Sequence, residues 1–288
     1  MYAPSFDYYR AGSVGEAQKL MQQHPGAKML AGGHSLIPLL KLRLTAPPAL
    51  IDIGRIPELK GITASNGTIR VGALTTHAEL ASSPAVKSGS PMVAEAAAQI
   101  GDAQVRNCGT IGGNVAHADP ASDLPTVLLA LEARFTAIGP NGERTIAAAD
   151  FFQGMMTTAL GQDELLTAVE VAAKKSGEGT AYVKFVHPAS RYAVIGVAAV
   201  VAVKDGACSA ARVAIGGLLP AAARARAVES ALVGARPSTD TIAKAAALVS
   251  KDLGADVLGD IFASAEYRRA MAAVFVKRAL TIAFTRAA

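Results

Sequence analysis

The feature of this sequence that most restricts its fold is a pair of glycines placed directly after a short apolar strand. Lys28–Ala31 has the composition of a buried strand, and Gly32–Ser35 breaks it. Two adjacent glycines allow the backbone to turn sharply and to approach a ligand closely. The amides that follow can form a concave anion site, helped by the start of the next helix, and Ser35 adds a hydroxyl donor. The same residues would also be typical of an ordinary tight turn between a strand and a helix.

A second glycine pair lies in Gly109–Asn114, again beside hydroxyl and amide donors. One such loop is weak evidence, but two of them fit a ligand with two phosphates and ribose-like hydroxyls. Asp119 and Asp123 follow the second segment. A carboxylate repels phosphate, so either residue would suit a ribose hydroxyl or an adenine amine. His34 and His117 lie beside or shortly after the two segments, where ligand contact and a structural role both stay open.

Several familiar sites are excluded because their motifs are missing. The chain has no P-loop motif GxxxxGK[ST], no dinucleotide motif GxGxxG, no zinc motif HExxH and no nucleophile elbow GxSxG. The five histidines show no zinc-type pairing, so we expect no metal site. Two cysteines, Cys108 and Cys208, cannot ligate an iron–sulfur cluster, which needs four protein ligands. If the protein performs redox chemistry, an organic cofactor must carry the electrons.

Composition narrows the class of protein further. With 51% hydrophobic and 18% charged residues, the chain should fold as a packed globular protein and not remain disordered. The net charge of +5 is dispersed along the chain, which argues against nucleic-acid binding. The longest apolar stretches, such as Ala193–Val203, are too short to cross a bilayer, and no signal peptide is visible. We therefore expect a cytoplasmic protein with reduced thiols.

The order of expected elements indicates an α+β protein in two parts. The first ~55 residues have the pattern of a compact β-α-β unit, and a mixed region of hairpins and short helices follows. Lys174–Gly179 is charged and contains glycine, as a linker would. Three strand-like runs come next: Ala181–Val186, Ala193–Val203 and Ala207–Ile215. The rest of the chain is rich in alanine and is expected to be helical.

These segments resemble the FAD-binding medium subunit of aerobic carbon monoxide dehydrogenases and related enzymes of the xanthine dehydrogenase family of molybdenum hydroxylases. The resemblance rests on Ala31–Pro38, Lys41–Arg43, Leu50–Ile53, Thr110–Asn114 and Asp119–Asp123, in that order. It covers essentially the whole chain. The two glycine motifs are specific to this type of subunit but say little about the substrate, for which carbon monoxide, purines, N-heterocycles and aldehydes all stay open.

The resemblance implies a vanillyl-alcohol-oxidase-like (PCMH-type) FAD-binding fold. It places two α/β subdomains at about residues 1–56 and 57–175, which together form the FAD-binding domain. A C-terminal domain, residues 176–288, would contain a three-stranded antiparallel sheet with helices.

The resemblance also implies which residues bind FAD. The main chain of Ala31–Ser35 and Thr110–Asn114 would grip the diphosphate, and Asp123 would contact the ribose or adenine end. Family members often carry a lysine that contacts the flavin near Phe185–Tyr192; here Val186 or His187 occupies that place, which puts the contact in doubt. The expected cofactor-binding residues are Lys28, Met29, Leu30, Ala31, Gly32, Gly33, His34, Ser35, Leu36, Ile100, Thr110, Ile111, Gly112, Gly113, Asn114, Asp119, Ala121, Asp123, Leu166 and Tyr192.

The function implied is electron transfer through non-covalently bound FAD, without a catalytic residue on this chain. Partners would be a large molybdopterin-binding subunit and a small subunit with [2Fe–2S] clusters, assembled as a dimer of heterotrimers in the cytoplasm or at the inner face of the membrane. FAD would take electrons from the clusters and pass them to an external acceptor, with quinone or an unidentified acceptor favoured over NAD. A stand-alone FAD oxidase of the same fold and a cofactor-free scaffold are the alternatives.

Overall fold

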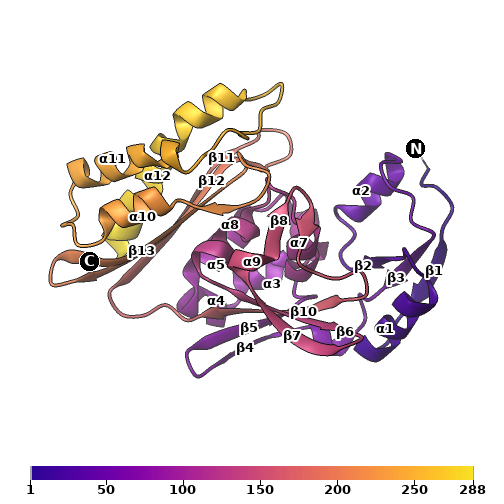
Figure 1. The fold of residues 1–288 in the computed structure, drawn as a ribbon. Coiled ribbons are helices and arrows are strands. Elements are labelled where there is room, and N and C mark those ends of the chain that lie inside the picture. Colours follow the sequence, from indigo (N-terminus) through magenta and orange to yellow (C-terminus); the bar gives the residue numbers. More distant parts are fainter. Residues whose placement is uncertain (1, 288) are drawn as a thin grey trace.

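The N-terminal unit is a small parallel sheet that presents the first glycine pair. The computed structural model describes residues 2–287 (Figure 1), and the unit lies at one end of the molecule. Its three strands run in the order β1-β3-β2, all parallel. The turn after β2 therefore opens at the carboxyl edge of the sheet. The elements are β1 (Asp7–Arg10), α1 (Val14–Gln23), β2 (Lys28–Leu30), α2 (Leu36–Lys41) and β3 (Ala49–Asp52).

The middle of the chain folds into a five-stranded antiparallel sheet covered by short helices. Its strand order is β4-β5-β10-β6-β7. Three short elements follow β7: α9 (Ala148–Phe151), β8 (Phe152–Gly154) and β9 (Thr157–Thr158). The sheet strands are β4 (Ile62–Ser65), β5 (Thr68–Gly72), β6 (Arg134–Gly139), β7 (Gly142–Ala147) and β10 (Leu165–Ala172), and a 3₁₀ turn, Pro57–Leu59, precedes them. The helices are α3 (His77–Ser82), α4 (Pro84–Gly89), α5 (Pro91–Gln99), α6 (Ala103–Cys108), α7 (Ile111–His117) and α8 (Asp123–Ala130).

The C-terminal part is an antiparallel sheet between two layers of helices. Residues 193–201 of β12 are all buried, because one face packs on α10–α12 and the other on the central core. This two-sided burial explains why the strand is an unbroken apolar run. The strands are β11 (Glu178–Val186), β12 (Ala193–Lys204), β13 (Ala207–Gly216) and β14 (Ala223–Arg224). The helices are α10 (Arg226–Leu232), α11 (Thr239–Ala247) and α12 (Ala265–Ala287), with a 3₁₀ turn at Leu248–Lys251.

Two expectations from the sequence need correction, and one strand was not expected. Gly109–Asn114 was expected to be a loop, but Ile111–His117 forms helix α7, because Thr110 caps it by accepting a hydrogen bond from the Gly113 amide. The expected three-stranded C-terminal sheet gains a short fourth strand, β14. Strand β1 was not foreseen as a separate strand. Within residues 2–287, none of the helices is both long and apolar enough to span a bilayer.

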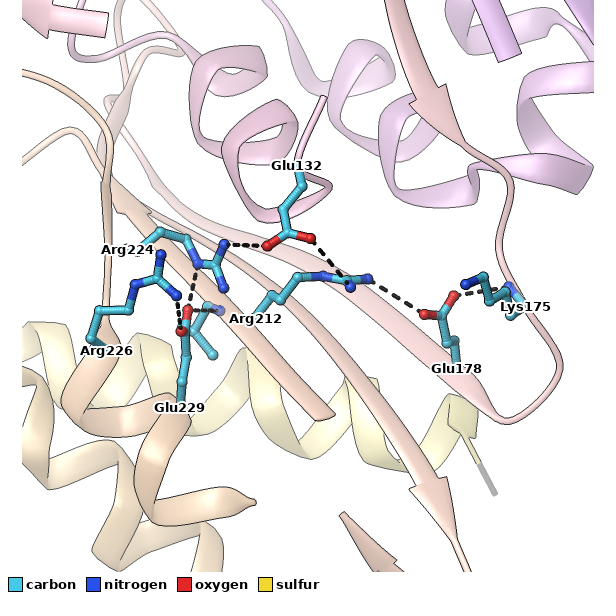
Figure 2. A network of polar contacts seen from close by, with 8 residues as sticks. Glu132, Lys175, Glu178, Arg212, Arg224, Arg226 and Glu229 are labelled. Carbon is cyan, nitrogen blue, oxygen red and sulfur yellow. Dashed lines mark hydrogen bonds and ion pairs between the residues drawn. The ribbon is translucent and has the colours of Figure 1, made fainter. Parts of the chain in front are cut away.

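A network of ion pairs joins the central part of the chain to the C-terminal sheet (Figure 2). Glu132, just after α8, pairs with Arg224 at 3.1 Å and with Arg212 at 3.6 Å. Arg224 also pairs with Glu229, which is 6% exposed and accepts a hydrogen bond from the Val213 amide at 2.8 Å. The buried half of the network is therefore centred on Glu229, and the exposed half on Glu132.

We expect the two glutamates to differ strongly in their contribution to stability. Glu229→Gln should lower the free energy of unfolding by about 3 kcal/mol, because it leaves the largely buried Arg224 without its close partner. Glu132→Gln should cost under about 1 kcal/mol, because the Glu132 side chain is 58% exposed. Thermal unfolding of both variants checks this, and equal shifts in melting temperature would contradict it.

Candidate functional site

One cavity of about 540 Å³ opens where the N-terminal unit, the central part and the segment before β12 meet. Its wall contains Gly32–Leu36 from the turn after β2 and Thr110, Gly112, Gly113 and Asn114 from the start of α7. Leu166 of β10 and Tyr192 lie on the same wall. Segments that are distant in sequence therefore line one space, as the two glycine motifs predicted.

The two glycine segments are in direct contact. A methyl group placed on Gly32 would lie 2.1 Å from the carbonyl oxygen of Cys108 and 2.9 Å from the Cα of Gly109. A methyl group on Gly113 would lie 3.7 Å from the Cβ of Ala31. Only a residue without a side chain fits at position 32. The glycine at this position is therefore required by the approach of two main chains, and not merely by the turn.

The turn after β2 offers free hydrogen-bond donors to the cavity. Across residues 2–287, no acceptor within the protein is found for the backbone amides of Gly32–Leu36. The carbonyl groups of this turn are used, since Gly33 and Ser35 accept from Ile37 and Leu39 in the first turn of α2. Gly33 has φ +71°, a left-handed conformation that glycine adopts without strain. A run of unpaired amides in such a turn is suited to bind an anion.

The second glycine segment has a different role, because its amides are already bonded within the protein. The Ile111 amide donates to the Thr75 carbonyl at 3.0 Å, and the Gly112 amide donates to the Ala73 carbonyl at 2.8 Å. The Gly113 amide donates to the Thr110 hydroxyl. This segment supplies close backbone approach and side chains more than free amides. From the sequence, both loops were expected to offer donors to the ligand. The bonds of Ile111 and Gly112 to Thr75 and Ala73 could not be foreseen, because these partners are distant in sequence.

Asn114 provides a polar atom that the fold leaves without a partner. Its amide nitrogen donates to the Ser122 hydroxyl at 2.9 Å, which fixes the orientation of the side chain. Its Oδ1 is buried and finds no hydrogen-bond donor among the described residues. Asn114 and Ser122 both line the cavity. A buried unpaired acceptor is costly, so a ligand with a donor group would fit here.

Asp123 is held by a buried lysine that the sequence analysis missed. Lys184 Nζ lies 3.0 Å from Asp123 Oδ1, and its side chain is 0% exposed. The Tyr182 hydroxyl also donates to Asp123. Burial raises the pKa of Asp123, and Lys184 and Tyr182 oppose that rise. The sequence analysis looked for a lysine of this region at Val186 or His187, two or three residues further along the chain. Both Asp123 oxygens have partners, and its contact with ribose stays a prediction.

Lys184 also connects three parts of the cavity wall. Besides Asp123, it donates to the carbonyl of Gln99 at 3.0 Å and to the carbonyl of Arg191 at 2.8 Å. Gln99 directly precedes Ile100, and Arg191 directly precedes Tyr192; Ile100 and Tyr192 both line the cavity. One buried ammonium group therefore positions wall residues from α5, α8 and the segment before β12. The signal available in the sequence was a lysine two residues after a tyrosine in the otherwise apolar run Ala181–Val186.

Tyr192 lines the cavity and is 38% exposed. Burial raises the pKa of its phenol, as does the nearby negative charge of Asp119. The ring is thus neutral at physiological pH and available for stacking on a planar ligand.

Most of the expected binding residues line the cavity. These are Lys28, Met29, Ala31, Gly32, Gly33, His34, Ser35, Leu36, Ile100, Thr110, Gly112, Gly113, Asn114, Asp123, Leu166 and Tyr192. The others do not: Leu30, Ile111, Asp119 and Ala121. Ile111 points into the central core, and Asp119 instead accepts a hydrogen bond from the Ala121 amide at 2.9 Å.

Residues 4–173 match the family model of the FAD binding domain in molybdopterin dehydrogenase. The chain belongs to this family. Residues 180–283 match the C-terminal domain of the carbon monoxide dehydrogenase flavoprotein. The protein is thus an FAD-binding medium subunit of the carbon monoxide dehydrogenase and xanthine dehydrogenase type, an oxidoreductase subunit with FAD as its cofactor. In such complexes, other subunits carry the molybdopterin and the iron–sulfur clusters.

Relatives of this family are similar over the full length of the chain. The carbon monoxide dehydrogenase medium chain of Hydrogenophaga pseudoflava is 42% identical, with 100% of both chains covered. The glyceraldehyde dehydrogenase medium chain of Sulfolobus acidocaldarius is 39% identical, covering 97% of this chain and 98% of that one. Among solved structures, carbon monoxide dehydrogenase from Hydrogenophaga pseudoflava matches with a TM-score of 0.96 at 43% identity, covering 100% of both chains. This structural match confirms the expected PCMH-type FAD-binding fold.

Proposed function

We propose that this chain is the electron-transfer subunit of a heterotrimeric molybdenum hydroxylase. One observation carries the proposal: the free amides of Gly32–Leu36 meet the second glycine segment at a single cavity. When bound there, FAD would supply the redox chemistry, accepting electrons from [2Fe–2S] clusters of a partner subunit and releasing them to an external acceptor. The protein itself binds and orients the cofactor, and we assign it no catalytic acid or base.

Within this proposal, each part of the wall has a distinct task. The amides of Gly32–Leu36 would hold the diphosphate, since free main-chain donors favour anionic oxygens. Asn114 would accept a hydrogen bond from the cofactor, because its Oδ1 has no partner among the described residues. Leu166 and Tyr192 would border the flavin ring, and Lys184 would hold Asp123 and the segment of Tyr192 in place. FAD would be bound without a covalent link.

The names of the relatives support the proposed partner subunits. Several are named as chains or subunits of larger complexes, among them a medium subunit of nicotine 6-hydroxylase and a subunit of the 6-hydroxypseudooxynicotine dehydrogenase complex. We infer that this chain joins a large molybdopterin-binding subunit and a small [2Fe–2S] subunit as a dimer of heterotrimers in the cytoplasm. We also propose two functional domains, residues 1–175 for FAD and residues 176–288 for the C-terminal domain.

The flavin content of the purified protein tests the proposal. We expect the chain, expressed with the large and small subunits, to show the absorbance of a flavin and to release intact FAD on denaturation. FAD that stays attached to the denatured chain would contradict non-covalent binding. Turnover of a substrate by the chain alone would favour a stand-alone oxidase instead. A folded complex without any flavin would refute the proposed function.

A further inference from the structure

His77 is a buried histidine in the cavity wall that the two glycine motifs do not include. It is the first residue of α3, it is 3% exposed, and its amide donates to the Gly109 carbonyl at 3.0 Å. A methyl group on Gly109 would lie 2.9 Å from Cδ2 of His77 and 3.1 Å from Nε2. The start of the second glycine segment therefore leaves room for this imidazole ring.

The fold does not satisfy the hydrogen-bonding capacity of this ring. His77 Nδ1 is buried and has no partner among the described residues. An apolar side chain of similar size would fill the same space without an unpaired polar atom, so packing alone does not account for a histidine. The ring lines the cavity together with Gly109 and Thr110. Because Nδ1 itself is sealed from the cavity, the ring nitrogen that a ligand there could reach is the other one, Nε2.

The ring is neutral at physiological pH and has a defined place for its single proton. The pKa of His77 is lowered to about 4, mainly by burial and also by the nearby His34 and Arg106. A neutral imidazole carries one N–H and one bare nitrogen. Because a sealed N–H without an acceptor is the more costly arrangement, Nδ1 should be the bare nitrogen. The proton then lies on Nε2, at the ring edge beside Gly109.

We propose that the Nε2–H of His77 donates a hydrogen bond to the diphosphate of the bound cofactor. The inference rests on the proposed function, because it needs FAD in this cavity. Position favours the diphosphate over other parts of FAD. Gly109 packs on Gly32, at the start of the free amides, and His34 of that same turn is near enough to lower the pKa of His77. A neutral N–H facing an anionic oxygen is a charge-assisted hydrogen bond.

The test compares nucleotide binding by the full-length chain, freed of FAD, with and without this donor. His77→Leu removes the N–H at similar volume, whereas His77→Gln keeps a donor near the position of Nε2. We expect His77→Leu to weaken the binding of both ADP and FAD by about 10- to 100-fold, as for loss of a hydrogen bond to a charged group. His77→Gln should stay within about 5-fold of the wild type, because its amide can replace the N–H.

The melting temperature and the affinity for ADP distinguish a binding role of His77 from a structural one. Without ligand, His77→Leu should melt at the wild-type temperature or above it, since it removes an unpaired buried nitrogen. Wild-type affinity for ADP in His77→Leu would overturn the inference, as would equal losses in both variants together with a lowered melting temperature. Failure of the folded wild-type chain to bind either nucleotide would instead refute the proposed function itself.

Discussion

Gly32→Ala is expected to abolish FAD retention while most of the protein stays folded. The added Cβ would lie 2.1 Å from the Cys108 carbonyl oxygen, which belongs to the main chain and cannot rotate away. The turn after β2 and the segment before α7 must therefore separate. Since the free amides of Gly32–Leu36 lie in that turn, they would no longer converge on the diphosphate. Loss of two charge-assisted hydrogen bonds corresponds to a Kd at least about 100-fold higher.

A matched glycine-to-alanine change controls for the chemistry of the substitution. Gly15 lies in α1, where an added Cβ would meet nothing within 4 Å. Gly15→Ala should retain FAD fully and gain about 1 kcal/mol of stability from helix propensity. Gly112 is unsuitable for this test, because a Cβ there would lie 2.5 Å from that of Ala73 and disturb the core as well. Wild-type flavin content in Gly32→Ala would contradict the assignment of the diphosphate site.

Lys184→Met should destabilise the protein strongly, by about 3–5 kcal/mol, because it leaves the Asp123 carboxylate buried without its counter-charge. The carbonyls of Gln99 and Arg191 would also lose their shared donor. The cavity wall should loosen at Ile100 and Tyr192 as a result. We expect a lower melting temperature and, in protein that still folds, weaker FAD binding. Thermal unfolding with and without FAD measures both effects.

The double variant Lys184→Met with Asp123→Asn distinguishes charge from packing. Because it removes the buried negative charge as well, it should recover part of the stability lost in the single variant. It should not recover FAD binding, since the carbonyls of Gln99 and Arg191 still lack a donor. If the single variant is as stable as the wild type, the buried pair has no structural importance. Full recovery of FAD binding in the double variant would contradict the positioning role of Lys184.

Local patterns in the sequence were sufficient to predict features such as tight turns and helix starts. The hairpin at Asn66-Gly67 forms between β4 and β5, as a turn of these residues predicts. Ser13 and Thr76 cap α1 and α3, each three residues before a glutamate, a spacing typical of helix starts. These features succeed because each depends on residues within one or two turns of chain. Strand β14 is only two residues long and depends on pairing with β13, so it had no local signal.

The sequence alone predicted that two glycine-rich segments line one site and, through their resemblance to a known family, that the cofactor is FAD. Only the tertiary structure decided which amides are free to bind it. The amides of Ile111 and Gly112 are occupied by Thr75 and Ala73, whereas those of Gly32–Leu36 find no acceptor in the described chain. The pairing of Lys184 with Asp123 was equally hidden. Hydrogen bonds and buried charges are satisfied by partners brought together from distant parts of the chain, and a single sequence carries no direct record of that pairing.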